Sequence, residues 1–289
     1  LKNMKVVVVS KYAPVPGYGS NPRWFELAKR FTKSGVQCEV ITSDSNHGSS
    51  YRVTEGKIAQ LQFESVTYSV LKTLKYKKTS SLARVLSWLD FDLQLFSFRR
   101  NITPDVIVIS SLSLTSIVFG IYIKLVKKAC LVFEVRDIWP LTMIEEGNFS
   151  SLNPLYLFLR AVELLGYRYA DLIVGTMPNL QQHVIESGIK KPKGAFYSCG
   201  IGVDPQRAEP TAKYKFTPEL ENFIKDKVVI GYCGSIGLTN NLTDFARYMK
   251  NSSKRNAVFL IAGDGAQKEL LTTQFKVQNN VIFLGKINP

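Results

Sequence analysis

The sequence has few of the residues that bind metals or form disulfides, with four cysteines and two histidines in 289 residues. The cysteines are far apart and form no C-x-x-C pair, so their spacing indicates neither a zinc knuckle nor a disulfide framework. The histidines form no H-E-x-x-H motif, and a G-x-S-x-G elbow is missing. We therefore expect no bound metal, neither a metalloenzyme nor an α/β-hydrolase, and a reducing compartment, the cytoplasm.

Long apolar runs are missing as well. The valine run at residues 6–9 is too short for the apolar core of a signal peptide. Residues 106–123 carry no charge over 18 positions and could be taken for a membrane span, but five of them are serine or threonine. A buried strand followed by a buried helix fits this segment better.

Acidic residues are outnumbered, since 23 Asp and Glu stand against 37 Lys and Arg, a formal net charge of +14. Such a charge favours anionic partners, which include phosphates, nucleic acid and an acidic membrane surface. The signatures of RNA-binding modules are missing, and we therefore expect no nucleic-acid partner.

The length and the 45% of hydrophobic residues favour two domains, residues 1–199 and 200–289. In the first, β-branched runs alternate with helical patterns, which is typical of an α/β fold with a doubly wound parallel sheet. We expect strands at 6–10, 38–42, 66–68, 106–109, 130–134, 172–175 and 195–198, and helices at 22–34, 82–99, 113–127, 154–169 and 178–187.

The same pattern restarts after the polar segment 202–226, where Pro205, Pro210 and Pro218 interrupt any helix. We expect strands at 228–233, 258–262 and 281–284, and helices at 241–251 and 266–273. Three parallel strands make half of a Rossmann-like nucleotide-binding domain, so we expect this second domain to be incomplete.

A glycine-rich loop joins the first strand to the first helix and contains Gly17 and Gly19. At this point a parallel sheet offers backbone N–H groups and a helix dipole to a phosphate. The loop matches neither the G-x-G-x-x-G fingerprint nor a Walker motif, and a plain turn is the alternative interpretation.

Two further glycine segments follow strands of the second domain. Gly234, Ser235 and Gly237 come after its first strand, and Gly263-Asp264-Gly265 follow its second. Because the carboxyl ends of parallel strands share one edge, these segments predict a nucleotide-diphosphate site there.

Charged residues end the strand at 130–134, where Glu134 is followed by Arg136 and Asp137. Charges at this position either face a ligand crevice or pair with one another. Both alternatives, a site or an ion pair of Arg136 with Asp137 or Glu134, stay open.

Residues 72–100 hold seven basic and two acidic residues beside an aromatic-rich helix. This composition favours docking on an anionic membrane surface, and a core helix with solvated flanks is the alternative.

With these residues in place, the sequence resembles a GT-B-fold glycosyltransferase of glycosyltransferase family 4, especially the bacterial branch that builds surface polysaccharides on lipid carriers. The resemblance spans nearly the whole chain in family order, in segments 5–42, 76–86, 134–140, 170–174, 200–204, 234–237, 261–265 and 281–285.

The resemblance implies a retaining transfer of a sugar from a UDP- or GDP-linked donor, held by the second domain, to an acceptor held by the first. The acceptor would be polyprenyl-diphosphate-linked or a saccharide, in O-antigen or capsule synthesis at the inner face of the cell membrane. Asp137 matches the family's catalytic position. The residues that match the loop near the donor phosphates and acceptor are Gly17, Gly19, Ser20, Asn21, Arg23 and Arg136.

The resemblance further implies no metal and no cofactor, because helix N-termini and basic side chains stabilise the leaving diphosphate. Two features depart from the family. Ser235 and Asn240 or Asn241 stand where many relatives have Arg and Lys, and the paired-glutamate segment expected after Gly285 is missing. We therefore expect weak donor binding by these residues. A sugar-nucleotide epimerase of the same fold and a non-catalytic nucleotide-sugar-binding fragment are the alternatives.

Overall fold

A computed structural model describes residues 4–19, 23–46, 49–76, 82–111, 113–145, 149–189, 194–200, 215–251, 256–276 and 279–287. The chain divides into two compact units, Leu1–Val203 and Asp204–Pro289, where the sequence predicted a boundary at 199/200. Each unit is an α/β structure with its own sheet and core.

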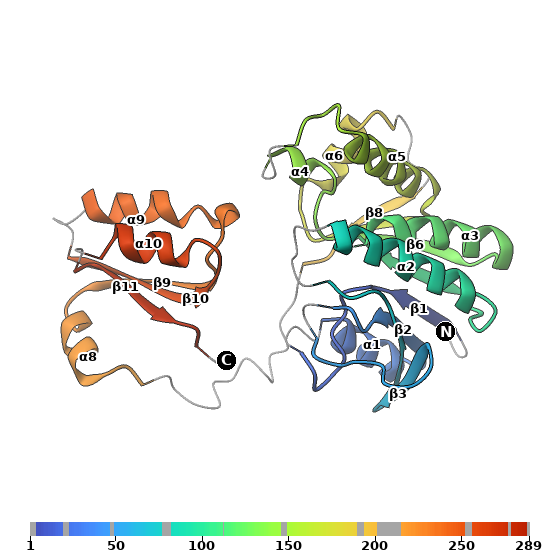
Figure 1. Ribbon diagram of the computed structural model, residues 1–289, viewed down its shortest axis with the longest axis horizontal. Helices are drawn as coiled ribbons and strands as arrows, with labels where there is room; N and C mark the ends of the chain where they lie inside the picture. Colours follow the sequence, from blue (N-terminus) through green and yellow to red (C-terminus); the bar gives the residue numbers. More distant parts are fainter. Residues whose placement is uncertain are drawn as a thin grey trace. The chain divides into compact units, whose positions relative to one another are not determined.

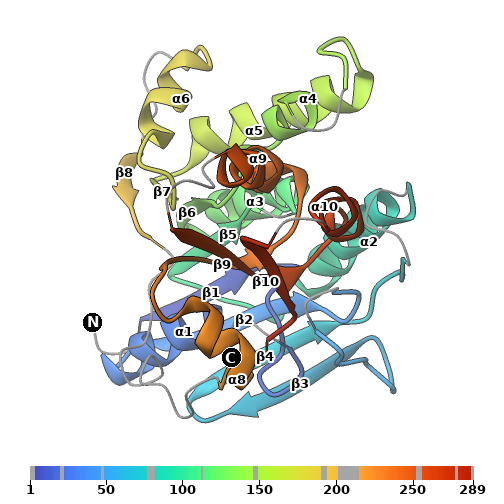
Figure 2. The ribbon, with the colours of Figure 1, turned by 90° about the vertical axis from the view of Figure 1, so that its left-hand side faces the viewer.

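Unit 1 contains an eight-stranded sheet among its described residues, in the order β3-β4-β2-β1-β5-β6-β7-β8. Figure 2 follows this order from β3 at the bottom to β8 at the upper left. Neighbouring strands are parallel except β3 and β4. The strands are β1 Lys5–Val9, β2 Gln37–Ser43, β3 Ile58–Phe63, β4 Val66–Leu71, β5 Val106–Ser110, β6 Cys130–Val135, β7 Leu172–Gly175 and β8 Ala195–Ser198.

Helices cover both faces of this sheet (Figure 1). On one face lies α1 (Arg23–Lys33), whose Trp24, Phe25 and Ala28 pack with Val6 and Val8 of β1. On the other lie α2 (Leu82–Phe98), the 3₁₀ turn η1 (Leu114–Ser116), α3 (Ile117–Lys127), α4 (Leu141–Glu145), α5 (Pro154–Tyr169) and α6 (Leu180–Glu186). Because both faces are covered, the central strands are continuous apolar runs rather than alternating ones.

The sheet has a topological switch point between β1 and β5. The chain winds outward from β1 through β2 to β4, then returns to place β5 on the other side of β1. Ligands of open parallel sheets bind outside the carboxyl ends of the strands at such a point. The loops after β1, β2, β5 and β6 are therefore where a site is expected in unit 1.

Unit 2 contains a three-stranded parallel sheet among its described residues, in the order β11-β10-β9. Its elements are α8 Pro218–Ile224, β9 Val228–Ser235, η2 Leu238–Asn240, α9 Leu242–Asn251, β10 Ala257–Asp264, α10 Lys268–Gln274 and β11 Val281–Gly285. Figure 1 shows α9 and α10 together on one face of the sheet. Phe259 and Ile261 of β10 pack there against Ala246, Met249 and Leu271.

Most predicted elements are confirmed within a few residues of their bounds. Among residues 106–123 the strand and the helix are confirmed as β5 and the first part of α3, and the 3₁₀ turn between them was not predicted. The interpretation of Pro218 as a helix breaker was wrong, because Pro218 opens α8. Thr217 caps that helix by accepting a hydrogen bond from the Leu220 amide at 3.4 Å. Strand β3 was not predicted; it has two glutamines among its six residues, and none of the six is buried.

None of the helices built from described residues is long and apolar enough to cross a membrane.

Candidate functional site

The glycine-rich loop of unit 1 is held by the segment that follows β2. The Ala13 carbonyl accepts hydrogen bonds from Thr42 Oγ1 at 2.7 Å and from Asn46 Nδ2 at 3.0 Å. Further along, the Ser50 amide donates to the Tyr18 carbonyl at 2.7 Å. Gly17 has a φ of 80°, and a Cβ there would meet no atom within 4 Å, so its surroundings are open. Ser20 and Asn21 lie outside the described residues.

Arg23 begins α1 and forms a buried ion pair with Glu134 at the end of β6. Arg23 Nη2 lies 2.7 Å from Glu134 Oε1, and the two side chains are 5% and 2% exposed. The sequence predicted Arg23 to lie near phosphates and acceptor. In the structure the Glu134 carboxylate, 111 residues further along the chain, compensates the charge of Arg23 and joins the start of α1 to the end of β6.

Unsatisfied polar atoms gather next to this pair, on the face of the sheet that α1 covers. Ser10 Oγ, Ser110 Oγ and Glu134 Oε2 are buried, and the described part of the chain provides no hydrogen-bond partner for them. Ser10 directly follows β1, Ser110 is the last residue of β5, and Glu134 lies near the end of β6. These three strands are neighbours at the switch point. Buried polar groups are nearly always satisfied, so these atoms mark a place for water or a ligand hydroxyl.

Asp137 and Arg136 follow β6 in the next loop. The Arg136 amide donates to Ser111 Oγ at 3.0 Å, and Thr176 Oγ1 donates to the Arg136 carbonyl at 3.3 Å. The Asp137 side chain is exposed. Within the described residues, no ion pair joins Arg136 to Asp137 or Glu134. The backbone of this loop is therefore fixed from β5 and β7, and the Asp137 carboxylate faces solvent.

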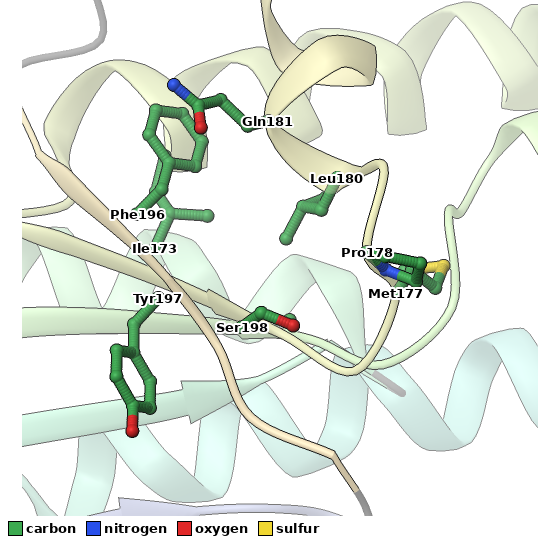
Figure 3. A pocket seen from close by; sticks show the side chains of 9 residues that line it. Ile173, Met177, Pro178, Leu180, Gln181, Phe196, Tyr197 and Ser198 are labelled. Carbon is green, nitrogen blue, oxygen red and sulfur yellow. The ribbon is translucent and has the colours of Figure 1, made fainter.

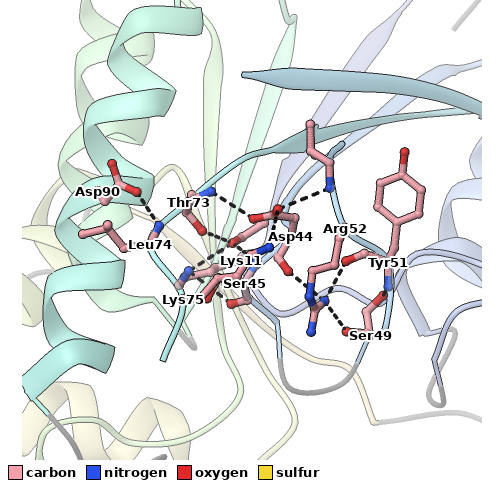
Figure 4. Close-up of polar contacts among 12 residues, drawn as sticks. Lys11, Asp44, Ser45, Ser49, Tyr51, Arg52, Thr73, Leu74, Lys75 and Asp90 are labelled. Atoms are coloured by element: carbon pink, nitrogen blue, oxygen red, sulfur yellow. Dashed lines mark hydrogen bonds and ion pairs between the residues drawn. The ribbon is translucent and has the colours of Figure 1, made fainter. Parts of the chain in front are cut away.

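Lys11, which the sequence analysis did not single out, is buried at the start of the glycine-rich loop and is 1% exposed. Its Nζ donates to Ser87 Oγ at 2.9 Å and to Ser43 Oγ at 3.2 Å. It also lies 3.5 Å from the Ser45 carbonyl, beside Asp44 (Figure 4). Burial lowers its pKa to about 7, opposed by the nearby carboxylates of Asp92, Asp90 and Asp44. No motif marks a lone lysine in a polar loop, so its burial is visible only once α2 is in place.

Two carboxylates near Lys11 order the surrounding segments. Asp44 Oδ1 accepts from the Thr73 amide at 2.9 Å, and its Oδ2 accepts from the Val53 amide at 3.3 Å. Asp92 accepts from Ser116 Oγ at 2.6 Å. Burial raises the pKa of Asp92 to about 6, although hydrogen bonds from serine and threonine hydroxyls oppose the shift. Together they join the loops after β2, β4 and β5.

A small pocket of about 100 Å³ lies between β7, β8 and the start of α6 (Figure 3). Its lining is mixed, with Ile173, Leu180 and Phe196 beside Gln181 and Ser198. It lies at the edge of the sheet and contains none of the residues that the sequence predicted for a site.

In unit 2 the two predicted glycine segments lie against each other at the carboxyl ends of β9 and β10. Gly263 has a φ of 149°, and a Cβ on it would lie 1.8 Å from the Gly234 carbonyl oxygen. Gly265 has a φ of 158°, and its Cβ would lie 2.4 Å from the Ile236 carbonyl oxygen. Close packing of the two turns thus explains these two glycines, a reason that the sequence did not indicate.

The remaining donor-site candidates surround that contact. The Ile236 amide donates to the Asp264 carbonyl at 2.9 Å. The Gly265 amide, which donates to Asp264 Oδ1 at 3.0 Å, lowers the pKa of that carboxyl, and Lys268 adds to the effect. Gly237 has extended backbone, with φ −123° and ψ 173°, at the start of η2. In this turn Ile236 is buried and its amide is already bonded, whereas Ser235 is exposed and Gly237 is half-buried. Ser235 and Gly237 are therefore the residues of the turn whose backbone could meet a phosphate.

The described residues bring together no group of three or more His, Cys, Asp or Glu side chains that would hold a metal ion. The groups available to a ligand are backbone amides, hydroxyls and carboxylates at the carboxyl ends of the strands in the two sheets. Unit 1 places Asp137 and the glycine-rich loop at such an edge, and unit 2 places its paired glycine turns at another.

No protein-family model matches the chain, and no curated protein matches it. Solved structures do. Sucrose-phosphate synthase from Thermosynechococcus elongatus is 12% identical, with a TM-score of 0.67 over 99% of this chain and 71% of that one. HepE from Anabaena, in complex with UDP and glucose, is 16% identical, with a TM-score of 0.59 over 98% and 70%.

A third is WaaG, a glycosyltransferase involved in lipopolysaccharide biosynthesis, which is 14% identical with a TM-score of 0.58 over 98% of this chain and 70% of that one. These neighbours are GT-B glycosyltransferases. At such identities the likeness concerns the fold, and it agrees with two α/β units that each carry a parallel sheet. The chain has the GT-B fold.

Proposed function

We propose that the protein transfers a sugar from a nucleotide-diphosphate donor to an acceptor, with retention of anomeric configuration. Unit 2 would bind a UDP- or GDP-linked donor, and unit 1 would bind a lipid-linked or saccharide acceptor in the synthesis of O-antigen or capsule. The supporting observation is the pair of glycine turns at the carboxyl ends of β9 and β10, in a fold shared with glycosyltransferases.

The donor site follows from the geometry of those turns. Gly263 and Gly265 pack against the backbone of Gly234 and Ile236, which fixes both turns without help from side chains. Ser235 and Gly237 then offer a hydroxyl and backbone N–H groups on the exposed side. A phosphate binds well to such preorganised donors. The complex of HepE with UDP and glucose supports a nucleotide-sugar ligand for this fold.

In the reaction the bond from the anomeric carbon to the diphosphate oxygen breaks, an acceptor oxygen bonds to that carbon, and the acceptor hydroxyl gives its proton to the leaving diphosphate. Asp137 would place its carboxylate near the reacting carbon, where positive charge develops. Gly17, Gly19 and Arg136 would border the acceptor. Because negative charge on the leaving diphosphate is balanced by N–H groups and basic side chains, no metal or cofactor is required.

The test is transfer from UDP- and GDP-sugars to a polyprenyl-diphosphate-linked sugar, with the product's anomeric configuration read by NMR. We expect an α-linked product from an α-linked donor. Donor conversion to an isomeric nucleotide sugar without acceptor would favour the epimerase alternative. Binding without any turnover would favour a non-catalytic nucleotide-sugar-binding protein.

We propose further that unit 1 docks on an anionic membrane surface through α2. The aromatic residues of this helix do not form the surface, because Trp88, Phe91 and Phe98 are buried in the core and Phe96 is half-buried against it. Three leucines at helical spacing are exposed instead, namely Leu86 at 55%, Leu89 at 44% and Leu93 at 67%. An exposed apolar stripe beside basic residues is suited to an acidic lipid surface.

Co-sedimentation with vesicles of anionic lipid tests this docking. Wild type should pellet at low salt and be released at high salt, because basic residues near the surface contribute roughly 1 kcal/mol each and salt screens them. Changing Leu86, Leu89 and Leu93 to serine should abolish pelleting. Equal sedimentation of both proteins, or of neither, would remove the membrane proposal and leave the transfer reaction untouched.

A further inference from the structure

Lys11 is the point at which three segments of unit 1 meet. Its own backbone opens the glycine-rich loop. Its side chain reaches Ser43 at the end of β2 and Ser45 just after it (Figure 4 labels Ser45). It also reaches Ser87 on α2, which lies 76 residues further along the chain. Lysine is almost never fully buried without such partners, because moving its charge out of water is costly. A methionine of similar length would fill the same space without that cost.

The loop depends on the segment that Lys11 holds. Ser43 N donates to the Lys11 carbonyl at 3.3 Å, so loop and segment are bonded in both directions. Three further hydrogen bonds join the loop to this segment. Asn46 Nδ2 donates to the Ala13 carbonyl, and the Val15 amide donates to Ser49 Oγ at 3.4 Å. The Ser50 amide donates to the Tyr18 carbonyl. Arg52 Nη1 closes this segment by donating to the carbonyls of Asp44 and Ser49, both at 2.9 Å.

We propose that Lys11 is a positioning residue, which sets the conformation of the glycine-rich loop for the acceptor by tying it to the segment after β2 and to α2. The inference rests on the proposed function in assigning the loop to the acceptor. Lys11 is buried and takes no part in the chemistry. Its loss should therefore weaken acceptor binding much more than turnover or donor binding.

The experiment compares Lys11→Met with Lys33→Met, a change at an exposed lysine in the last turn of α1. We expect Lys11→Met to raise the acceptor KM at least tenfold, with kcat and donor KM within threefold of wild type. Lys33→Met should match wild type. Equal acceptor KM in all three proteins, or a fall in kcat without a change in acceptor KM, would overturn the proposal.

Ser87→Ala tests whether α2 acts through Lys11. It removes one hydrogen-bond acceptor and leaves the lysine, so it should raise the acceptor KM about threefold alone and have no further effect in the Lys11→Met background. Additive effects of the two changes would contradict the proposal. Ser87→Ala also keeps the test available if Lys11→Met does not fold.

Hydrogen exchange separates this proposal from the proposed function, since it needs no substrate. In Lys11→Met the amides of Val15, Tyr18 and Ser50 should exchange at least tenfold faster, while those of β1 should exchange at the wild-type rate. Should wild type transfer no sugar, the proposed function fails, and this exchange pattern still decides whether Lys11 orders the loop. Unchanged exchange in the loop would refute it.

Discussion

The buried ion pair of Arg23 with Glu134 gives the sharpest prediction on stability. The Arg23 Nη2 and Glu134 Oε1 atoms lie 2.7 Å apart, and the two side chains are 5% and 2% exposed. At a charge separation of about 4 Å and an effective dielectric constant near 20, the attraction is about 4 kcal/mol. Removing Arg23 leaves Glu134 buried with an uncompensated charge and with Oε2 already lacking a partner. Breaking a buried pair usually costs about 3 to 5 kcal/mol. We therefore expect Arg23→Met to lower the free energy of unfolding of unit 1 by about 4 kcal/mol.

The assay is urea unfolding followed by tryptophan fluorescence, to which Trp24 next to Arg23 contributes. Glu134→Gln should cost about 3 kcal/mol, and the double variant should lose much less than the sum of the two, because the neutral pair leaves no buried charge. Lys29→Met is the matched control on the same helix. Its partner Glu64 is 58% exposed, so the change should cost under about 1 kcal/mol. A loss below about 1 kcal/mol in Arg23→Met, with weakened acceptor or nucleotide binding, would refute the structural role and favour Arg23 as a ligand contact.

Three further predictions concern other parts of the chain. Because burial lowers the pKa of Lys11 from 10.5 to about 7, the unfolded chain binds more protons between these values. The free energy of unfolding should therefore rise with pH from about 7, by up to about 1.4 kcal/mol per pH unit from this group. Urea unfolding of wild type and Lys11→Met at pH 7 and 9 should show this rise in wild type alone, and equal rises would contradict it. Gly263→Ala should lower the free energy of unfolding of unit 2 by about 3 kcal/mol or more, since its Cβ would lie 1.8 Å from the Gly234 carbonyl oxygen. Gly231→Ala is the control, because a Cβ there would meet no atom within 4 Å, and it should change thermal unfolding little. Asp137→Asn should leave the melting temperature unchanged, because the side chain is exposed, and lower turnover at least tenfold; ordinary turnover would show that Asp137 is not catalytic.

Much of the fold follows from local sequence pattern. The alternation of β-branched runs and helices predicted the parallel sheets, and Asn153 followed by Pro154 marks the start of α5 as the structure has it. Strand β3 escaped prediction because it is an antiparallel strand at the sheet edge, where two of its six residues are glutamine and none is buried. Pro218 was misread because a proline ends one helix and opens another equally well, and only the Thr217 cap distinguishes the two.

The site is less readable from sequence because its key contacts join distant residues. Glu134 was singled out, but its partner Arg23 lies 111 residues away and not in the neighbouring loop. Lys11 was not singled out, because it lies in a loop and its burial depends on Ser87 and Phe91 of α2. Gly263 and Gly265 were predicted as donor-site residues because they follow a strand at the carboxyl edge of the sheet. The structure shows that the chain's own backbone makes the close approach.

The proposed function depends on the turn at 235–237 binding the donor's diphosphate. Ligand-detected NMR with UDP and GDP tests this binding most directly, because the method detects weak binding. The variant is Gly237→Val, which the extended backbone at Gly237 accepts while its side chain blocks approach to the N–H groups. Gly231→Val, within β9 and before the turn, is the control in open surroundings. We expect wild type and Gly231→Val to bind equally and Gly237→Val to bind at least tenfold more weakly, with thermal unfolding unchanged in all three. Equal binding by all three proteins, or no binding by wild type, would contradict the account.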